Sequence, residues 1–231
     1  MDSCYEKILR RIVEYRKLCC VSQKRMSQCL GITQSHYSKM ERGKCEIPFR
    51  IVNRWNAIGW DVDYFVTGRH FQASDGLFEK YTGMPYEQVY KELMKFIVGS
   101  FRSHQTPMDA DILRMKHALE LLVWNDAKHA LFRNARIMQQ AAQNEMAEKL
   151  GIGVRKYRRL EMGKEKPDLR IMGTMYVLSG YLPALFLDYE AGICKMSQYL
   201  WNQLEESQQK KVLYFVDSAK KLVILGKKDR Y

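Results

Sequence analysis

The sequence contains few residues that break helices or build disulfide frameworks. Only five prolines and six cysteines occur in 231 residues, and no two cysteines have CxxC spacing. A disulfide framework is therefore not expected, and the cysteines favour a reducing environment. The five histidines show no zinc-ligand spacing with cysteine or carboxylate residues, so no metal site is expected either.

Long apolar runs are absent as well. No stretch approaches the roughly 18 apolar residues of a membrane span, and residues 1–13 lack the apolar region of a signal peptide. The glycines form no phosphate-binding loop, and the serines and lysines have no recognisable catalytic partners. We therefore expect a soluble cytoplasmic protein that is not an enzyme, has no catalytic residues and needs no cofactor.

The chain does carry an excess of positive charge, with a net charge of +12 at pH 7. The excess is +6 for residues 1–70, +3 for 131–190 and +4 for 191–231, whereas residues 71–130 carry −1. Basic residues concentrated in separate stretches indicate a polyanionic partner such as nucleic acid. The nearly neutral residues 71–130 are typical of a spacer or of a region that faces a protein partner.

Apolar residues recur at helical spacing, which predicts an all-α fold. The first part of the pattern predicts helices over residues 5–20, 23–30 and 34–40, with closing helices over 48–65. Further helices are expected over 86–101 and 109–124. The remaining pattern predicts helices over 126–141, 143–150, 154–160 and 167–188, and a last helical pair over 196–225.

An internal repeat with an offset of 120 residues is the most informative feature. Residues 136–164 repeat residues 16–44 with these identities: Arg16/Arg136, Gln23/Gln143, Met26/Met146, Leu30/Leu150, Gly31/Gly151, Ile32/Ile152, Tyr37/Tyr157, Glu41/Glu161, Gly43/Gly163 and Lys44/Lys164. In each copy a glycine separates two short helices. This order predicts a helix-turn-helix that occurs twice.

The repeated pattern resembles a known family. Gln23-x-x-Met26-Ser27-x-x-Leu30-Gly31-Ile32-Thr33-x-x-x-Tyr37-Ser38-x-Met40-Glu41-x-Gly43 is similar to the phage-repressor/Cro helix-turn-helix family, also called the xenobiotic-response-element (XRE) family. Residues 143–163 resemble it again. The resemblance implies two repressor-like helical bundles, each placing its second short helix in the major groove of double-stranded DNA.

Several repeated residues are expected to hold the fold rather than to contact DNA. Arg16 with Glu41, and Arg136 with Glu161, keep one separation in both copies, which predicts an ion pair between the first and third helices. The glycines of each copy are expected to take the left-handed conformation. Ser22 and Thr33 are expected helix N-caps, and the second copy has Ala142 and Gly153 in their places.

The resemblance assigns DNA contacts to exposed residues around the start of the second short helix. In the first copy, the expected DNA-binding residues are Gln23, Thr33, Gln34, Ser35, His36, Lys39, Arg42 and Lys44. A glutamine such as Gln34 can bond an adenine edge, whereas the family places Gln23 against a phosphate.

The second copy has different side chains at these positions. Its expected DNA-binding residues are Gln143, Val154, Arg155, Lys156, Arg158, Arg159 and Lys164. Arg155 can read guanine and Val154 a thymine methyl, which would give the two copies different sequence preferences. Alternatively, Lys156, Arg158 and Arg159 contact only phosphate.

We therefore predict a first helix-turn-helix domain (1–68), a helical connector (69–108), a second helix-turn-helix domain (109–190) and a C-terminal helical tail (191–231). The expected function is sequence-specific regulation of transcription, with repression as the family's usual outcome, by a nucleoid-associated protein. The expected partners are double-stranded DNA and, through the connector or the tail, a second copy of the chain. The alternatives are an inhibitor or antitoxin-type module that binds a protein partner, and RNA binding; no membrane partner is expected.

Overall fold

The computed structural model describes residues 3–71, 94–95, 97–100, 109–124 and 130–228 of the chain. In those ranges every regular element is an α-helix and none is a strand, which confirms the predicted all-α fold. The chain divides into two compact units, residues 1–71 with 128–192 and residues 72–127 with 193–231. The predicted domain boundaries stay predictions. The predicted helix over 86–101 lies mostly outside the described residues.

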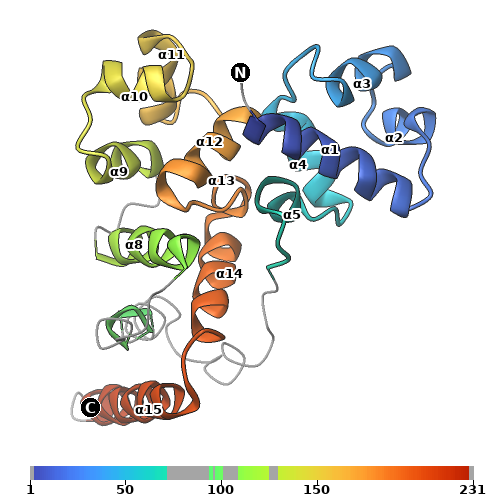
Figure 1. Cartoon of the computed structure of the whole chain (residues 1–231). Helices are drawn as coiled ribbons and strands as arrows, with labels where there is room; N and C mark the ends of the chain where they lie inside the picture. Colours follow the sequence, from blue (N-terminus) through green and yellow to red (C-terminus); the bar gives the residue numbers. More distant parts are fainter. Residues whose placement is uncertain (1–2, 72–93, 96, 101–108, 125–129, 229–231) are drawn as a thin grey trace. The chain divides into compact units, whose positions relative to one another are not determined.

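The first unit begins with five helices, which we call the first segment (residues 3–71; blue to teal in Figure 1). They are α1 (Ser3–Leu18), α2 (Gln23–Cys29), α3 (Gln34–Glu41), α4 (Phe49–Ala57) and α5 (Val62–Thr67). Aromatic rings form the centre of the segment: Trp55 is fully buried, stacks on Trp60 at 6.0 Å and meets Phe65 edge-on at 5.7 Å. Such rings bury large apolar areas, which stabilises the two closing helices.

The second segment (residues 130–188) repeats this order of helices. It contains α9 (Leu131–Met138), α10 (Gln143–Lys149), α11 (Val154–Glu161), α12 (Leu169–Ser179) and α13 (Ala184–Leu187). The 120-residue offset persists beyond the region of sequence identity, because α4 shifted by 120 falls within α12. The two predicted ends of the first helices, at residues 20 and 141, are wrong: Cys20 and Gln140 have φ angles of 55° and 48°, which end α1 and α9 earlier.

The two segments pack against each other within the first unit. Helix α12 contacts both α1 and α5, and α1 and α12 lie side by side in Figure 1. The backbone N–H of Leu169 donates to the carbonyl of Ile47 at 3.0 Å, and that of Ala184 donates to the buried carboxylate of Asp63 at 2.9 Å. A Cβ on Gly173 would lie 2.6 Å from Ile8 Cδ1, so the glycine allows α12 to approach α1 closely. These contacts join residues far apart in sequence.

The second unit contains α8 (Ala110–Trp124) and α15 (Glu206–Lys228), and α14 (Tyr189–Trp201) continues into it from the first unit. Its buried apolar residues include Met115, Leu119 and Leu200. Helices α14 and α15 confirm that residues 196–225 contain two helices, although α14 begins at Tyr189, before the predicted start. Across the described ranges, the structure contains no helix both long and apolar enough to cross a membrane.

Restoring a missing helix cap should stabilise the second segment. Ala142 takes the extended backbone of an N-cap (φ −74°, ψ 166°) before α10 but supplies no side-chain hydrogen bond, whereas Ser22 accepts from Arg25 N before α2. We expect Ala142→Ser to raise the free energy of unfolding by about 1 kcal/mol. Thermal unfolding measures the change, and Ser22→Ala should show a loss of similar size. A destabilising Ala142→Ser would contradict the prediction.

Candidate nucleic-acid interface

The two short helices of the first segment have the geometry of a helix-turn-helix. Ser22 Oγ caps α2, and Thr33 Oγ1 accepts from His36 N at 3.2 Å to cap α3, as predicted. Gly31 lies in the turn between them with φ +60°, in the left-handed region that glycine favours. Met26, Leu30, Tyr37 and Met40 are buried at the contact between the helices.

A buried ion pair fixes α3 to α1, as the sequence predicted. Arg16 Nε donates to Glu41 Oε1 at 2.6 Å, and Gln23 Nε2 donates to the other carboxylate oxygen at 2.6 Å. Burial alone would raise the pKa of Glu41, but the hydrogen bonds from Arg16 and Gln23 outweigh it, so the pKa is lowered. The carboxylate therefore links all three helices in its ionised form.

The second segment repeats the ion pair in a more exposed form. Arg136 Nη2 donates to Glu161 Oε1 at 2.9 Å, and Gln143 Nε2 donates to Glu161 Oε2. The Arg136 side chain is 23% exposed, compared with 9% for Arg16. Gly151 has φ +65° in the turn, and neither Ala142 nor Gly153 makes a side-chain cap. The second segment keeps the same framework without the two side-chain caps of the first, and Glu145 Oε2 instead accepts from Ala142 N at 2.8 Å.

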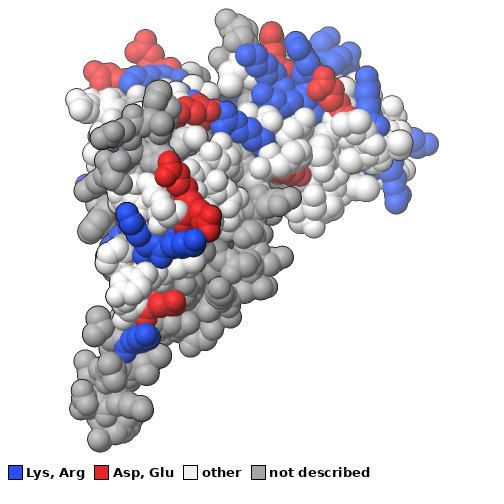
Figure 2. All heavy atoms as spheres, turned by 60° about the horizontal axis from the view of Figure 1, so that its bottom comes forward, with Lys and Arg blue, Asp and Glu red and all other residues white. Residues whose placement is uncertain are grey.

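The first turn of α3 presents the predicted DNA-reading residues to solvent. Gln34 and Ser35 are exposed and His36 is half-buried, while the expected contacts Thr33, Lys39 and Lys44 are also exposed. Arg42 is exposed, with its Nε donating to the backbone carbonyl of Ser38 at 3.1 Å. Figure 2 shows lysine and arginine side chains, with some acidic side chains among them, at the upper right of that view, on the side of the first segment.

Gln23 has a structural contact that the sequence did not reveal. The resemblance assigns it to a phosphate, but its side-chain amide donates to Glu41 and the residue is half-buried. The amide of Gln143 makes the corresponding bond to Glu161. A structural role for both glutamines therefore accompanies their expected contact with DNA, which stays a prediction.

The basic residues of α11 have partners of their own. Lys156 Nζ lies 3.2 Å from Asp168 Oδ2, Arg158 Nε donates to Gln143 Oε1 at 3.1 Å, and Arg159 Nε lies 3.1 Å from Glu165 Oε2. From the sequence, we did not predict that Glu165 and Asp168 pair with these cations. A signal was present, because the corresponding positions 45 and 48 of the first segment are cysteine and proline. Val154 is half-buried, while Arg155 and Lys164 are exposed and make no ion pair among the described residues.

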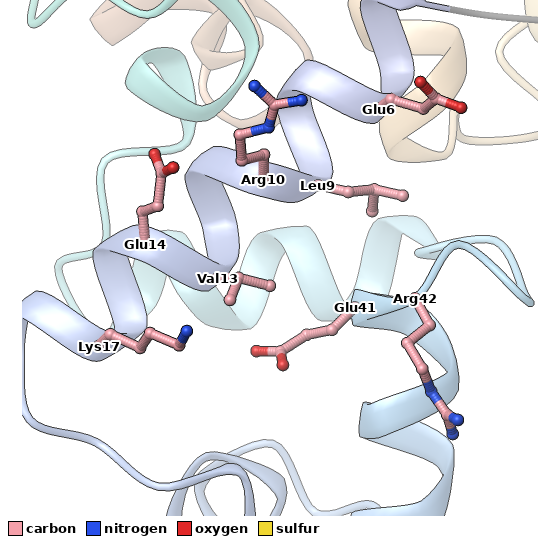
Figure 3. A pocket seen from close by; sticks show the side chains of 8 residues that line it. All are labelled: Glu6, Leu9, Arg10, Val13, Glu14, Lys17, Glu41 and Arg42. Atoms are coloured by element: carbon pink, nitrogen blue, oxygen red, sulfur yellow. The ribbon is translucent and has the colours of Figure 1, made fainter.

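A shallow groove of about 390 Å³ runs between α1 and the end of α3 (Figure 3). In that view Val13 of α1 points toward the α3 side, and Glu41 points back toward α1. Lys17 and Arg42 also line the groove. The charged groups around it include no cluster of three or more metal-ligating side chains, and none occurs elsewhere in the part of the chain that the structure describes.

Comparison with known proteins adds a relative. The chain is 33% identical over 93 residues to YonR, a SPbeta prophage-derived uncharacterized HTH-type transcriptional regulator of Bacillus subtilis (strain 168). The match covers 86% of that protein and 36% of this chain. This chain belongs to the same helix-turn-helix family. No protein-family model matches the chain, and no solved structure matches it.

Proposed function

We propose that this helix-turn-helix protein regulates transcription by binding double-stranded DNA, with α3 as its main recognition helix. The observation that carries the proposal is the first segment itself. Its Arg16, Glu41 and Gln23 side chains fix α1, α2 and α3 together, while the first turn of α3 leaves Gln34 and Ser35 exposed. The relationship to a prophage-derived transcriptional regulator supports the same function.

The chemistry of α3 suits contact with a DNA groove. The Gln34 side chain has one acceptor and two donors, which match the N6 and N7 edge of adenine. Lys39 and Lys44 are exposed and make no ion pair among the described residues, so their charges are available to phosphates. Phosphate contacts of this kind position a protein, and base contacts specify the sequence.

We also propose that the second segment supplies a further DNA-binding surface of the XRE type. Both segments belong to one compact unit, so their recognition helices are presented by one scaffold. Two linked modules can contact half-sites about 34 Å apart on one duplex, as a dimer of single modules does. The different side chains of α3 and α11 then favour a target without two-fold symmetry.

Truncating Gln34 tests whether α3 reads bases. We expect Gln34→Ala to weaken binding to a selected site by about 1–3 kcal/mol and to relax the preference at one base position. Fluorescence anisotropy with the selected duplex measures the loss, and Asn56→Ala, an exposed amide on α4, is the control. Equal weakening on all sequences would show that Gln34 does not read a base.

Selection of bound sequences from random duplex DNA, run at two salt concentrations, tests the proposal as a whole. Two distinct half-motifs at a fixed spacing would support two reading segments. One motif, lost on Gln34→Ala, would restrict reading to α3. The absence of any enriched sequence and of salt-dependent binding would overturn DNA binding as the function.

A protein partner is the second candidate, and the second segment carries the observation that favours it. Lys17 and Arg42 in the groove of Figure 3 correspond to Ile137 and Met162, which are 51% and 58% exposed. Leu9 lies against Gly43 in the first segment, whereas the space next to Gly163 is open. A cavity of about 370 Å³ lies there, lined by Phe132, Leu160 and Phe186 among others.

The two candidate functions differ in their response to salt. Apolar docking on the second segment should persist or strengthen as salt rises, whereas phosphate contacts weaken steeply.

Self-association through the C-terminal tail also belongs to this proposal, because Tyr214 of α15 is 70% exposed. Sedimentation of the full chain over a range of concentrations measures it.

A further inference from the structure

Three of the four cations of the second recognition helix have partners within the protein. Lys156 pairs with Asp168, Arg159 pairs with Glu165, and Arg158 donates to the amide oxygen of Gln143. Helix α11 therefore presents less available positive charge than its sequence suggests. Arg155 differs from its neighbours, because it is exposed and makes no ion pair within the described residues.

These pairs are specific to the second segment. The positions equivalent to Glu165 and Asp168 are Cys45 and Pro48, neither of which carries a charge. Lys39, the equivalent of Arg159, is exposed and has no ion pair among the residues that the structure describes. One scaffold thus carries a recognition helix with an available lysine and another in which carboxylates offset the charges of two cations, Lys156 and Arg159.

The two acids hold their cations with different strength. Asp168 is only 9% exposed, and its other oxygen caps α12 by accepting from Ile171 N at 2.9 Å. This hydrogen bond holds the Asp168 side chain in place independently of its ion pair with Lys156. Glu165 and Arg159 are 31% and 52% exposed, and ion pairs of that kind are weak and easily exchanged in water. Arg159 is therefore the easier of the two cations to release.

We propose that Glu165 and Asp168 are built-in counter-anions that attenuate DNA binding by the second segment, with Arg155 as the cation of α11 that has no side-chain partner among the described residues. The inference rests on the proposed function. A DNA phosphate that binds Arg159 or Lys156 meets a cation whose charge a carboxylate already offsets, so those contacts release less free energy than contacts from unpaired cations. The carboxylates also repel the phosphate backbone directly.

The inference predicts a gain of binding when the acids are neutralised. We expect Glu165→Gln to bind a fluorescein-labelled random-sequence duplex more tightly, by up to about eightfold at 0.1 M salt, and to steepen the salt dependence by about 0.9 log units per log unit of salt. Asp168→Asn should act in the same direction, and asparagine keeps the N-cap of α12. Adding Arg159→Gln to Glu165→Gln should remove the gain.

Glu148→Gln is the matched control. It removes the same charge from an exposed glutamate of α10 that makes no side-chain ion pair among the described residues. If the wild type binds DNA but Glu165→Gln has the same affinity as Glu148→Gln, the inference is overturned and the proposed function stands. A wild-type chain that binds neither random nor selected duplexes would overturn the proposed function, and the inference with it.

Discussion

Replacing Arg16 by leucine is expected to destabilise the first segment by about 3–5 kcal/mol, because it leaves the buried carboxylate of Glu41 without its main partner. The Arg16 and Glu41 side chains are 9% and 4% exposed, so water cannot replace the lost contact. Arg136→Leu removes the equivalent pair, whose arginine is more exposed, and should cost about 1–3 kcal/mol. Urea unfolding of both variants measures the difference.

The same ion pair makes stability depend on acid. The pKa of Glu41 is lower in the folded chain than in the unfolded chain, so its stabilisation is complete above the ordinary glutamate pKa and is lost as the pH falls through the folded value. Glu41→Gln should be less stable at neutral pH and should lose less on acidification. Equal losses in the wild type and Glu41→Gln would show that another group causes the acid sensitivity.

Gly192→Ala is the second substitution with a large expected effect. A Cβ at this position of α14 would lie 2.5 Å from the backbone nitrogen of Leu185 and 2.9 Å from the carbonyl carbon of Ala184. Backbone atoms cannot rotate away as a side chain does, so α13 and α14 would have to separate. We expect a loss of about 3 kcal/mol or more, at the upper end for overpacked sites.

Gly99→Ala is the control for Gly192→Ala. Gly99 is also helical, but among the described residues no atom outside its own helix backbone lies within 4 Å of the added Cβ, and alanine is the better helix former. Gly99→Ala should therefore be neutral or slightly stabilising in the same unfolding experiment. A Gly192→Ala chain as stable as the wild type would contradict the close packing of α14 on α13.

Local features of the fold could be predicted because they depend on residues close together in sequence. Ser22 and Thr33 cap the helices that follow them, and the glycines of both turns have positive φ, as expected from the chemistry of each residue. The recurring separation of Arg16 and Glu41 predicted a pair between helices. Repetition within one chain made this longer-range contact visible.

Contacts without such a local signal were not predicted. The packing of α12 on α1 depends on Gly173 meeting Ile8, and no periodicity in either helix indicates that pairing. The pairing of Lys156 with Asp168 likewise depends on how the loop after α11 returns to it. For the candidate site, the sequence indicated which residues face outward from the recognition helices. It did not indicate which of those cations already pair with a carboxylate of the same chain.

The order of synthesis gives the contact between α1 and α12 a further consequence. The guanidinium of Arg170 lies over the ring of Tyr5 at 4.7 Å, and Ile8 packs where Gly173 leaves room. A ribosome makes Tyr5 and Ile8 before it makes Arg170 and Gly173, so this apolar side of α1 stays uncovered until the second segment has been made. The nascent first segment therefore exposes apolar surface that favours aggregation until the second segment has emerged.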